Sequence, residues 1–245
     1  MLLRRPRSFR MDALRLTSRI APPPVVQVSG SIPAGEPFLV TINHYTRPGF
    51  DAWWLALAVS AALEQDVHWV MTSAWTFPGR WYAGLLRPLS RRVFARLAQI
   101  YGFSLTPPMP PDPAESQARA ASVRQVLEQA RSNPKKVIGL SPEGGDFPGG
   151  ALGWPPHGVG RFIYQFTRQG YKILPVGIYE EDGTLFVRLG SLYPLSEPHS
   201  HANGEINPDT FRLVSQRQVD LLLRRTIMRR IAVLLPARLQ GPFTS

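Results

Sequence analysis

The sequence predicts an α/β fold: a single domain in which a largely parallel central sheet is flanked by helices. Short segments rich in β-branched residues alternate with segments of helical spacing along almost the whole chain, which is typical of strand–helix–strand units. The 245 residues are 44% hydrophobic and 10% aromatic, enough for a sizeable core. We divide the chain into a basic N-terminal leader, residues 1–24, and one domain, residues 25–241, and find no internal repeat.

The stretch 38–57, FLVTINHYTRPGFDAWWLAL, is the centre of this prediction. Its β-branched and aromatic residues predict a buried strand at 38–42, and a Pro-Gly pair then breaks the chain. The apolar run 52–63 predicts a core helix, because it is shorter than the roughly 18 residues of a membrane span. Asp51 stands where that helix begins, a position that favours a capping carboxylate. The stretch therefore places His44 at a strand end and Asp51 one loop away.

The remaining elements follow from the same patterns. We expect further strands at residues 25–28, 67–71, 100–106, 136–140, 172–178 and 184–189. We expect further helices at residues 115–131, 158–169 and 211–235. Proline-rich, glycine-rich and polar loops are expected at residues 107–113, 141–150 and 196–208.

The charge of the chain favours phosphate-bearing partners. The net charge is +11, and the 28 basic residues include only three lysines, so arginine dominates. Such a surface attracts lipid head groups, nucleic acids or nucleotide-bearing substrates, although a solvated basic face without a partner has the same composition. Segment 74–96 mixes aromatic residues with arginine and contains no acid. It suits a helix against a membrane surface or over a cleft, or ordinary packing with an exposed basic face.

The composition also limits the cellular compartments and the kinds of catalytic chemistry that are possible. The chain has no cysteine, which excludes disulfides, thiol nucleophiles and thiolate zinc sites. We find no apolar run long enough to span a membrane, and the basic N-terminus lacks the apolar core of a signal peptide. Its arginine-rich start also resembles a transit peptide. We expect a cytoplasmic protein that binds a membrane surface peripherally.

The residues of the central stretch suggest general-base chemistry. His44 beside the carboxylate of Asp51 would have the partner that fixes an imidazole tautomer. A surface histidine and a helix-capping aspartate give the same pattern. After the strand 136–140, Glu143, Gly144 and Gly145 offer backbone N–H groups with little steric obstruction, suited to an oxyanion or a close ligand approach.

Three other interpretations compete with this one. Ser141 with His44 and Asp51 has the residue types of a hydrolase triad, but its surroundings lack the second glycine of a nucleophile elbow. A metal site could be built from His199, His201, Glu197 and Glu205. Nucleic-acid binding rests on charge alone. We predict no metal site and no nucleic-acid partner.

Four stretches, taken in order, resemble the glycerolipid acyltransferases, which acylate glycerol phosphate and lysophosphatidate. They are residues 28–44, similar to a strand–turn–strand ending in Asn-His; 140–145, similar to Phe-Pro-Glu-Gly-Thr-Arg; 158–166, similar to a Lys-x-Gly helix; and 174–178, similar to a Val-Pro-Val strand. The ending MRRIAVLLPARLQG also resembles the family's C-terminus. The resemblance covers roughly Val25 to Gly241.

This resemblance implies a glycerol-3-phosphate acyltransferase-like fold and an O-acyltransferase activity. A fatty acyl group would pass from acyl-CoA or acyl-carrier protein to a hydroxyl of a lysophospholipid or a similar glycerolipid acceptor. His44 would be the general base and Asp51 its partner, and Glu143 would help to bind the acceptor. The thioester is a co-substrate, so no cofactor is implied. The alternative is a catalytically weakened lipid-binding protein of the same fold.

The sequence departs from the family pattern at three points. Six residues separate His44 from Asp51, where the family has four. No arginine lies between Tyr101 and Pro107, and Gly145-Asp146 replaces the family's Thr-Arg. Both places carry phosphate-contacting arginines in the family, and Asp146 would repel a phosphate. The acceptor is therefore expected to differ from lysophosphatidate, unless Arg47 in the longer loop replaces the missing cations.

Overall fold

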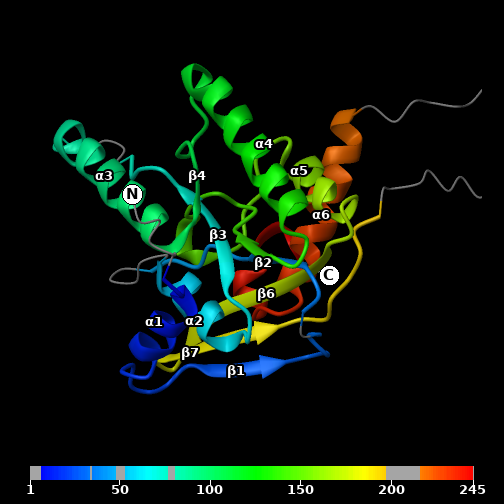
Figure 1. Ribbon diagram of the computed structural model, residues 1–245. Coiled ribbons are helices and arrows are strands. Elements are labelled where there is room, and N and C mark those ends of the chain that lie inside the picture. The colour runs from blue at the N-terminus through cyan, green and yellow to red at the C-terminus, as the bar shows by residue number, and fades with distance from the viewer. Residues whose placement is uncertain (1–6, 34, 48–52, 77–80, 197–215, 245) are drawn as a thin grey trace, which may run out of the picture.

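The computed structural model describes residues 7–33, 35–47, 53–76, 81–196 and 216–244, and it is built on one seven-stranded sheet (Figure 1). The strand order is β1-β7-β6-β2-β5-β3-β4. The strands are β1 Val25–Val28, β2 Phe38–Ile42, β3 Val67–Thr72, β4 Ser104–Thr106, β5 Val137–Leu140, β6 Lys172–Glu181 and β7 Thr184–Leu189. Every neighbouring pair is parallel except the β6–β7 hairpin. The predicted α/β class with a largely parallel sheet is confirmed.

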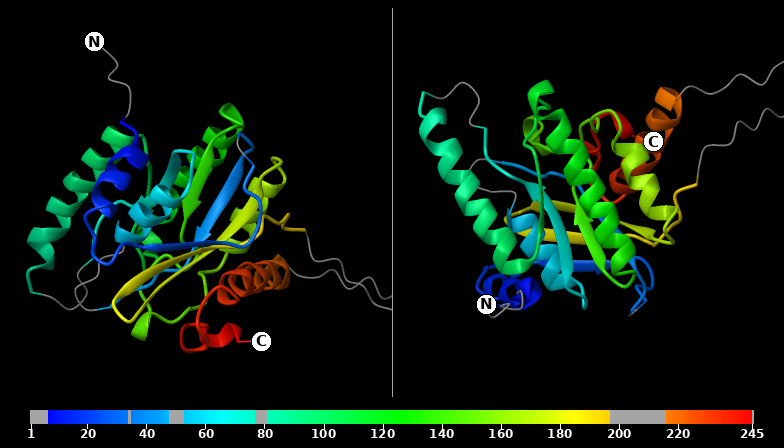
Figure 2. Two further views of the ribbon diagram at one scale, coloured as in Figure 1. Left: turned by 90° about the horizontal axis from the view of Figure 1, so that it is seen from below. Right: turned by 45° about the horizontal axis from the view of Figure 1, so that its top comes forward.

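Helices cover both faces of the sheet. They are α1 Phe9–Thr17, α2 Trp53–Ala62, α3 Ala83–Tyr101, α4 Ser116–Ser132, α5 Val159–Thr167 and α6 Gln216–Ala232. α1 packs on α2, while α5 packs on α6. The view from below in Figure 2 shows α1 and α2 on the opposite side of the sheet from α6. The sheet is therefore the middle layer of three.

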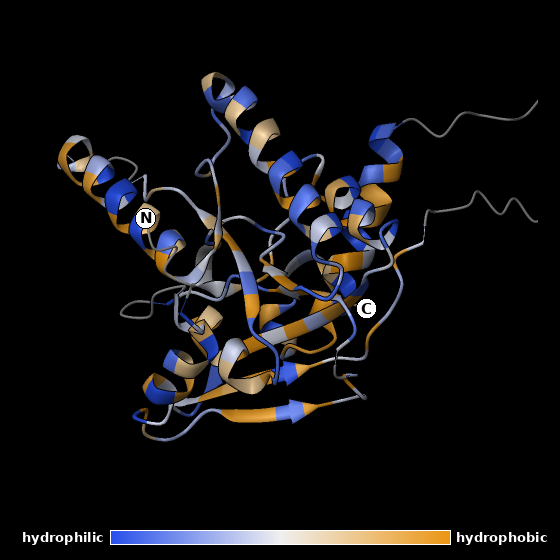
Figure 3. Cartoon of the chain, in the orientation of Figure 1, coloured by the Kyte–Doolittle hydropathy of each residue, from blue (hydrophilic) through white to orange (hydrophobic). Residues whose placement is uncertain are grey.

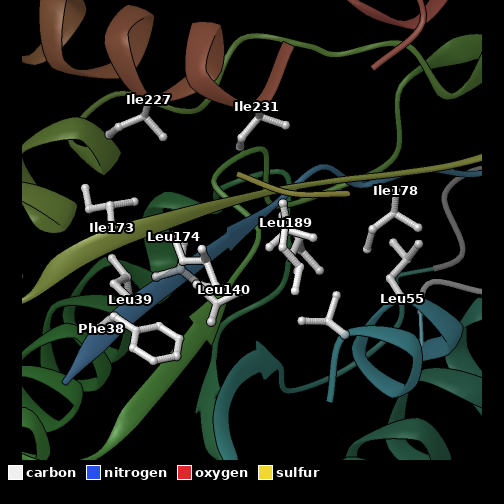
Figure 4. Close-up of a cluster of buried hydrophobic side chains, with 14 of the residues drawn as sticks. Phe38, Leu39, Leu55, Leu140, Ile173, Leu174, Ile178, Leu189, Ile227 and Ile231 are labelled. Carbon is white, nitrogen blue, oxygen red and sulfur yellow. The ribbon is translucent and has the colours of Figure 1, made fainter. Parts of the chain in front are cut away.

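The core is centred on β2, whose five residues are all buried. Leu39 pairs in register with Ile173 of β6 on one side and with Ile138 of β5 on the other. Leu55 of α2 approaches from one face, and Ile227 and Ile231 of α6 cover the other (Figure 4). A strand buried on both faces reads as a continuous apolar run, which is why the sequence identified it.

One strand prediction was wrong in part. The segment 100–106 was expected to be a strand, but α3 continues to Tyr101 and only Ser104–Thr106 pairs with β3. Gly102 ends the helix in a left-handed conformation, with φ of 72°. Glycine adopts that conformation without a Cβ penalty, so it is a common helix terminator. The helix expected at 211–235 is described from Gln216 to Ala232, and residues 211–215 lie outside the described part.

Within the described residues, none of the helices has the length and apolar content that crossing a bilayer requires.

Candidate functional site

The site begins where β2 ends, at the edge of the sheet formed by the carboxyl ends of its parallel strands. In open α/β sheets, ligands bind outside this edge. Asn43 is buried and fixes the chain there, because its Nδ2 donates to the Ile178 carbonyl (2.8 Å) and its Oδ1 accepts from the Ile178 N–H (2.7 Å). The next residue, His44, is therefore held at a defined point between β2 and β6.

Glu143 ties the loop after β5 to His44. Its Oε2 accepts from the backbone N–H of His44 (2.6 Å), and its Oε1 accepts from the N–H of Gly153 (2.7 Å). The side chain is buried, and burial raises the pKa of this carboxyl to about 7. Both oxygens are thus engaged by the backbone. The predicted part of Glu143 in acceptor binding stays a prediction.

The glycines that follow give the loop its shape. Gly144 has a left-handed φ of 71°, and its N–H donates to the Ser141 carbonyl (3.3 Å). A Cβ on Gly144 would lie 3.1 Å from Cγ of Met109, so the proline-rich loop after β4 approaches closely here. At Gly145 a Cβ would meet open space. A side chain at position 144 would therefore press on Met109, whereas position 145 has room for one.

Asp146 is the carboxylate that the structure brings to His44. Oδ1 of Asp146 lies 2.7 Å from Nδ1 of His44, and the side chains are 63% and 21% exposed respectively. The contact with His44 lowers the pKa of Asp146. The two atoms are close, but the imidazole is not aligned for a hydrogen bond with any described residue at Nδ1. Asp51, the partner predicted from the sequence, lies outside the described residues.

The sequence did not predict this contact of Asp146 with His44, because Asp146 was considered only as a charge that would repel phosphate. A usable signal was present, because β2 and β5 are neighbours and the loops that follow parallel neighbours meet at the same edge. Asp146, which follows β5 closely, was therefore a candidate partner for His44, which follows β2, in addition to Asp51.

Arg47, proposed from the sequence as a phosphate ligand, binds a carboxylate of the protein. Its Nη2 donates to Oε1 of Glu180 (2.8 Å), and its Nε donates to Oε2 of the same residue. Glu180 lies near the end of β6 and raises the pKa of the Arg47 guanidinium. The fork of the guanidinium thus holds a carboxylate in the geometry that a phosphate would require.

A further arginine, Arg119 of α4, reaches the segment after β4. Its Nη1 and Nη2 donate to the carbonyls of Pro107 (3.1 Å) and Pro108 (2.8 Å). This is the region in which the family resemblance predicts a phosphate-contacting arginine. This cation belongs to a helix farther along the chain, so it is not among residues 101–107.

The competing interpretations gain little from the structure. Oγ of Ser141 is buried and has no hydrogen-bond partner among the described residues, and the contact of His44 is to Asp146. His68 is a core residue whose Nε2 lies 2.9 Å from Oγ of Ser104. The described residues contain no cluster of three potential metal ligands. The predicted alternative metal ligands, His199, His201, Glu197 and Glu205, lie outside the described part.

Comparisons with known proteins place these observations in a family context. The model of the family described as Acyltransferase matches residues 25–179. The crystal structure of the 1-acyl-sn-glycerophosphate (LPA) acyltransferase PlsC from Thermotoga maritima is similar, with a TM-score of 0.50 and 15% sequence identity, over 92% of this chain and 78% of that one. At that identity the similarity is one of fold. No curated protein sequence matches the chain. The resemblance drawn from the sequence motifs is confirmed by the family match.

Proposed function

The chain belongs to the acyltransferase family, and on this premise we propose that it moves a fatty acyl group from a thioester to a hydroxyl of a glycerolipid or lysophospholipid acceptor. The observation that carries the proposal is the position of His44 at the carboxyl end of β2, with Asp146 2.7 Å from Nδ1. Once the imidazole is aligned with this carboxylate, a hydrogen bond from Nδ1 would favour the tautomer that is protonated there. Nε2 is then the nitrogen that can accept a substrate proton.

The reaction follows from these groups. His44 takes the proton of the acceptor hydroxyl while the oxygen attacks the thioester carbonyl. The new C–O bond forms, the C–S bond breaks, and the departing thiolate receives the proton from the imidazolium. The negative charge on the carbonyl oxygen can be met by a backbone N–H of the open loop at Gly145. No acyl-enzyme forms, because the attacking group belongs to the substrate.

We further propose that the preferred acceptor lacks a terminal phosphate monoester. Arg47 is paired with Glu180, and Arg119 donates to backbone carbonyls. The charge beside His44 is that of Asp146, which opposes a phosphate. An uncharged glycerolipid or a phosphodiester head group fits this balance better.

The donor and the location are proposals of the same kind. Acyl-CoA and acyl-carrier protein both carry phosphate, which suits a net charge of +11. Neither requires a cofactor. The acceptor resides in a membrane, so we place the protein peripherally at its cytoplasmic surface.

Thioester consumption by the purified full-length chain tests the proposal. With acyl-CoA or acyl-carrier protein and a panel of lysolipids, we expect turnover by the wild type. His44→Ala should reduce turnover by about 10²- to 10⁴-fold, the usual contribution of a general base, while circular dichroism stays unchanged. Saturable lipid binding without any turnover would favour a lipid-binding protein that has lost catalysis. Near wild-type turnover by His44→Ala would refute the assigned base.

The acceptor preference requires its own comparison. Lysophosphatidate is set against monoacylglycerol and lysophosphatidylglycerol, for the wild type and for Arg47→Ala and Arg119→Ala. We expect the wild type to prefer acceptors without a phosphate monoester. The opposite outcome has two parts: the wild type clearly prefers lysophosphatidate, and Arg47→Ala or Arg119→Ala raises the KM for this acceptor alone. That outcome would show that an arginine restores phosphate binding.

A further inference from the structure

The helix α3 lies on the body of the protein with little of its surface covered. Of its 19 residues, only Ser90 and Phe94 are buried. Leu85, Leu89 and Val93 are 76%, 53% and 46% exposed, and Trp81 just before the helix is 90% exposed. Single exposed apolar residues are common, but a contiguous group marks an interaction site.

The exposed apolar residues share one side of α3. Leu85, Leu89 and Val93 recur every fourth residue, a spacing that places side chains one above another on a helix. Figure 3 shows hydrophobic and hydrophilic segments alternating along this helix. The four residues Trp81, Leu85, Leu89 and Val93 are called the α3 stripe below.

The charges on α3 are all positive. The helix contains four arginines and no acid. Arg87 and Arg91 each donate to Oε1 of Glu115 (3.2 Å), whereas Arg92 and Arg96 are exposed. On a helical projection Arg92 and Arg96 fall beside Leu85 and Leu89, since they lie seven residues farther along. The α3 stripe is therefore flanked by two exposed cations.

The topology relates this stripe to the site. α3 leaves the carboxyl end of β3 and returns to the start of β4, and the two strands are parallel. The first turns of the helix therefore lie toward the sheet edge that carries His44. Only β5 separates β3 from β2. The first residues of the α3 stripe therefore lie toward the same edge of the sheet as His44.

We propose that the α3 stripe docks the protein on an anionic lipid surface. A bilayer interface accepts apolar side chains at the acyl boundary and pairs the flanking arginines with anionic head groups. A second copy of the chain would bring arginine against arginine at this helix, and nucleic acid would leave the leucines without an apolar contact. The inference rests on the proposed function, since it names the surface that supplies the lipid acceptor.

Sedimentation of the full-length chain with vesicles tests the assignment. The probes are phosphatidylcholine vesicles with and without phosphatidylserine. The wild type should sediment with the anionic vesicles and be released by salt. The double variant Leu85→Glu/Leu89→Glu should lower the partition coefficient by about tenfold or more, because it removes apolar contact and adds repulsion. Arg92→Gln/Arg96→Gln should lower it by about fivefold per arginine on anionic vesicles only.

A matched control separates the stripe from a general effect of charge. Val26 and Val28 of β1 are also exposed and apolar, and Val26→Glu/Val28→Glu should bind vesicles like the wild type. Equal binding by Leu85→Glu/Leu89→Glu and the wild type, or equal loss in the control, would overturn the proposal. So would a wild-type dimer, or a DNA complex, that the leucine substitutions disrupt in place of vesicle binding.

A separate activity measurement distinguishes an error in the α3 docking proposal from an error in the proposed acyltransferase function. Activity is measured without vesicles, on a short-chain lysolipid below its micellar concentration. The leucine variant should retain wild-type turnover there, since α3 contributes nothing to the chemistry. A wild type that turns over no monomeric acceptor but binds vesicles through α3 would reject the enzyme and keep the docking surface.

Discussion

Under the proposed function, Asp146, which stands where the family motif has an arginine, would be the carboxylate that orients the base His44. The atoms Nδ1 and Oδ1 lie 2.7 Å apart. A carboxylate in this place stabilises the imidazolium that forms as the proton is taken. We expect Asp146→Asn to lower kcat by about tenfold or more with little change in KM, since it acts on proton transfer and not on binding.

Two comparisons make this prediction specific. Asp182→Asn removes the same charge at an exposed hairpin position and should leave kcat unchanged. Asp51→Asn tests the partner predicted from the sequence. Wild-type kcat in Asp146→Asn, together with strong loss in Asp51→Asn, would assign the orienting role to Asp51.

Site residues that follow from a local sequence pattern could be predicted, whereas contacts between distant parts of the chain could not. His44 and Glu143 follow the buried strands β2 and β5, whose residues are mostly apolar, so the local pattern located them. The contacts of Asp146 with His44 and of Arg119 with Pro107 arise only through the pairing of strands and the path of α4. Such contacts depend on the three-dimensional arrangement, which no local pattern contains. Arg47 was located but not its partner, because Glu180 is distant in sequence.

Among the helices, α5 depends on a carboxylate that belongs to α6. Asp220 accepts from the backbone N–H groups of Gly158 (2.9 Å) and Arg161 (3.1 Å), at the start of α5. Its Oδ2 also lies 3.0 Å from Nε of Arg224, and both side chains are almost fully buried. A Cβ on Gly160 would lie 2.7 Å from the Asp220 carbonyl, so the two helices approach closely here.

We therefore expect Asp220→Asn to reduce the free energy of unfolding by about 3–5 kcal/mol, because it leaves the Arg224 charge buried without a carboxylate. Urea denaturation measures the change. Glu181→Gln is the matched control: it removes one partner of the exposed Arg238–Glu181 pair and should cost about 1 kcal/mol or less. Similar losses in the two variants would show that the buried pair has no special importance.

For the molecule as a whole, the alternation of apolar segments was enough to predict a largely parallel sheet, because it reflects local periodicity. The order of the strands was not predictable in this way. The antiparallel β6–β7 hairpin extends the sheet, and β1 joins it beside β7. Nor could the sequence show that α3 would bury so little, since its basic and apolar composition fits a packed helix equally well.

Two buried groups give the molecule opposite responses to pH. Burial, aided by Lys136, lowers the pKa of His68 from 6.5 to about 4, so only the unfolded chain gains this proton as the pH falls through that range. His68 therefore destabilises the fold on acidification. Burial raises the pKa of Glu143 from 4.5 to about 7, so the fold retains a proton that the unfolded chain loses as the pH rises. Glu143 therefore destabilises the fold on alkalinisation.

Because each pKa change corresponds to about 3 kcal/mol at full effect, the two contributions should largely cancel in the wild type between the unfolded pKa values of 4.5 and 6.5. Removing either group should reveal the other. We expect the free energy of unfolding of Glu143→Gln, relative to the wild type, to fall as the pH decreases through this range, and that of His68→Gln to fall as the pH increases. Urea denaturation at several pH values measures both slopes, and they do not depend on any constant loss of stability that the substitutions cause. If the curves of unfolding free energy against pH for both variants run parallel to that of the wild type, neither group has a different pKa in the folded and unfolded chain.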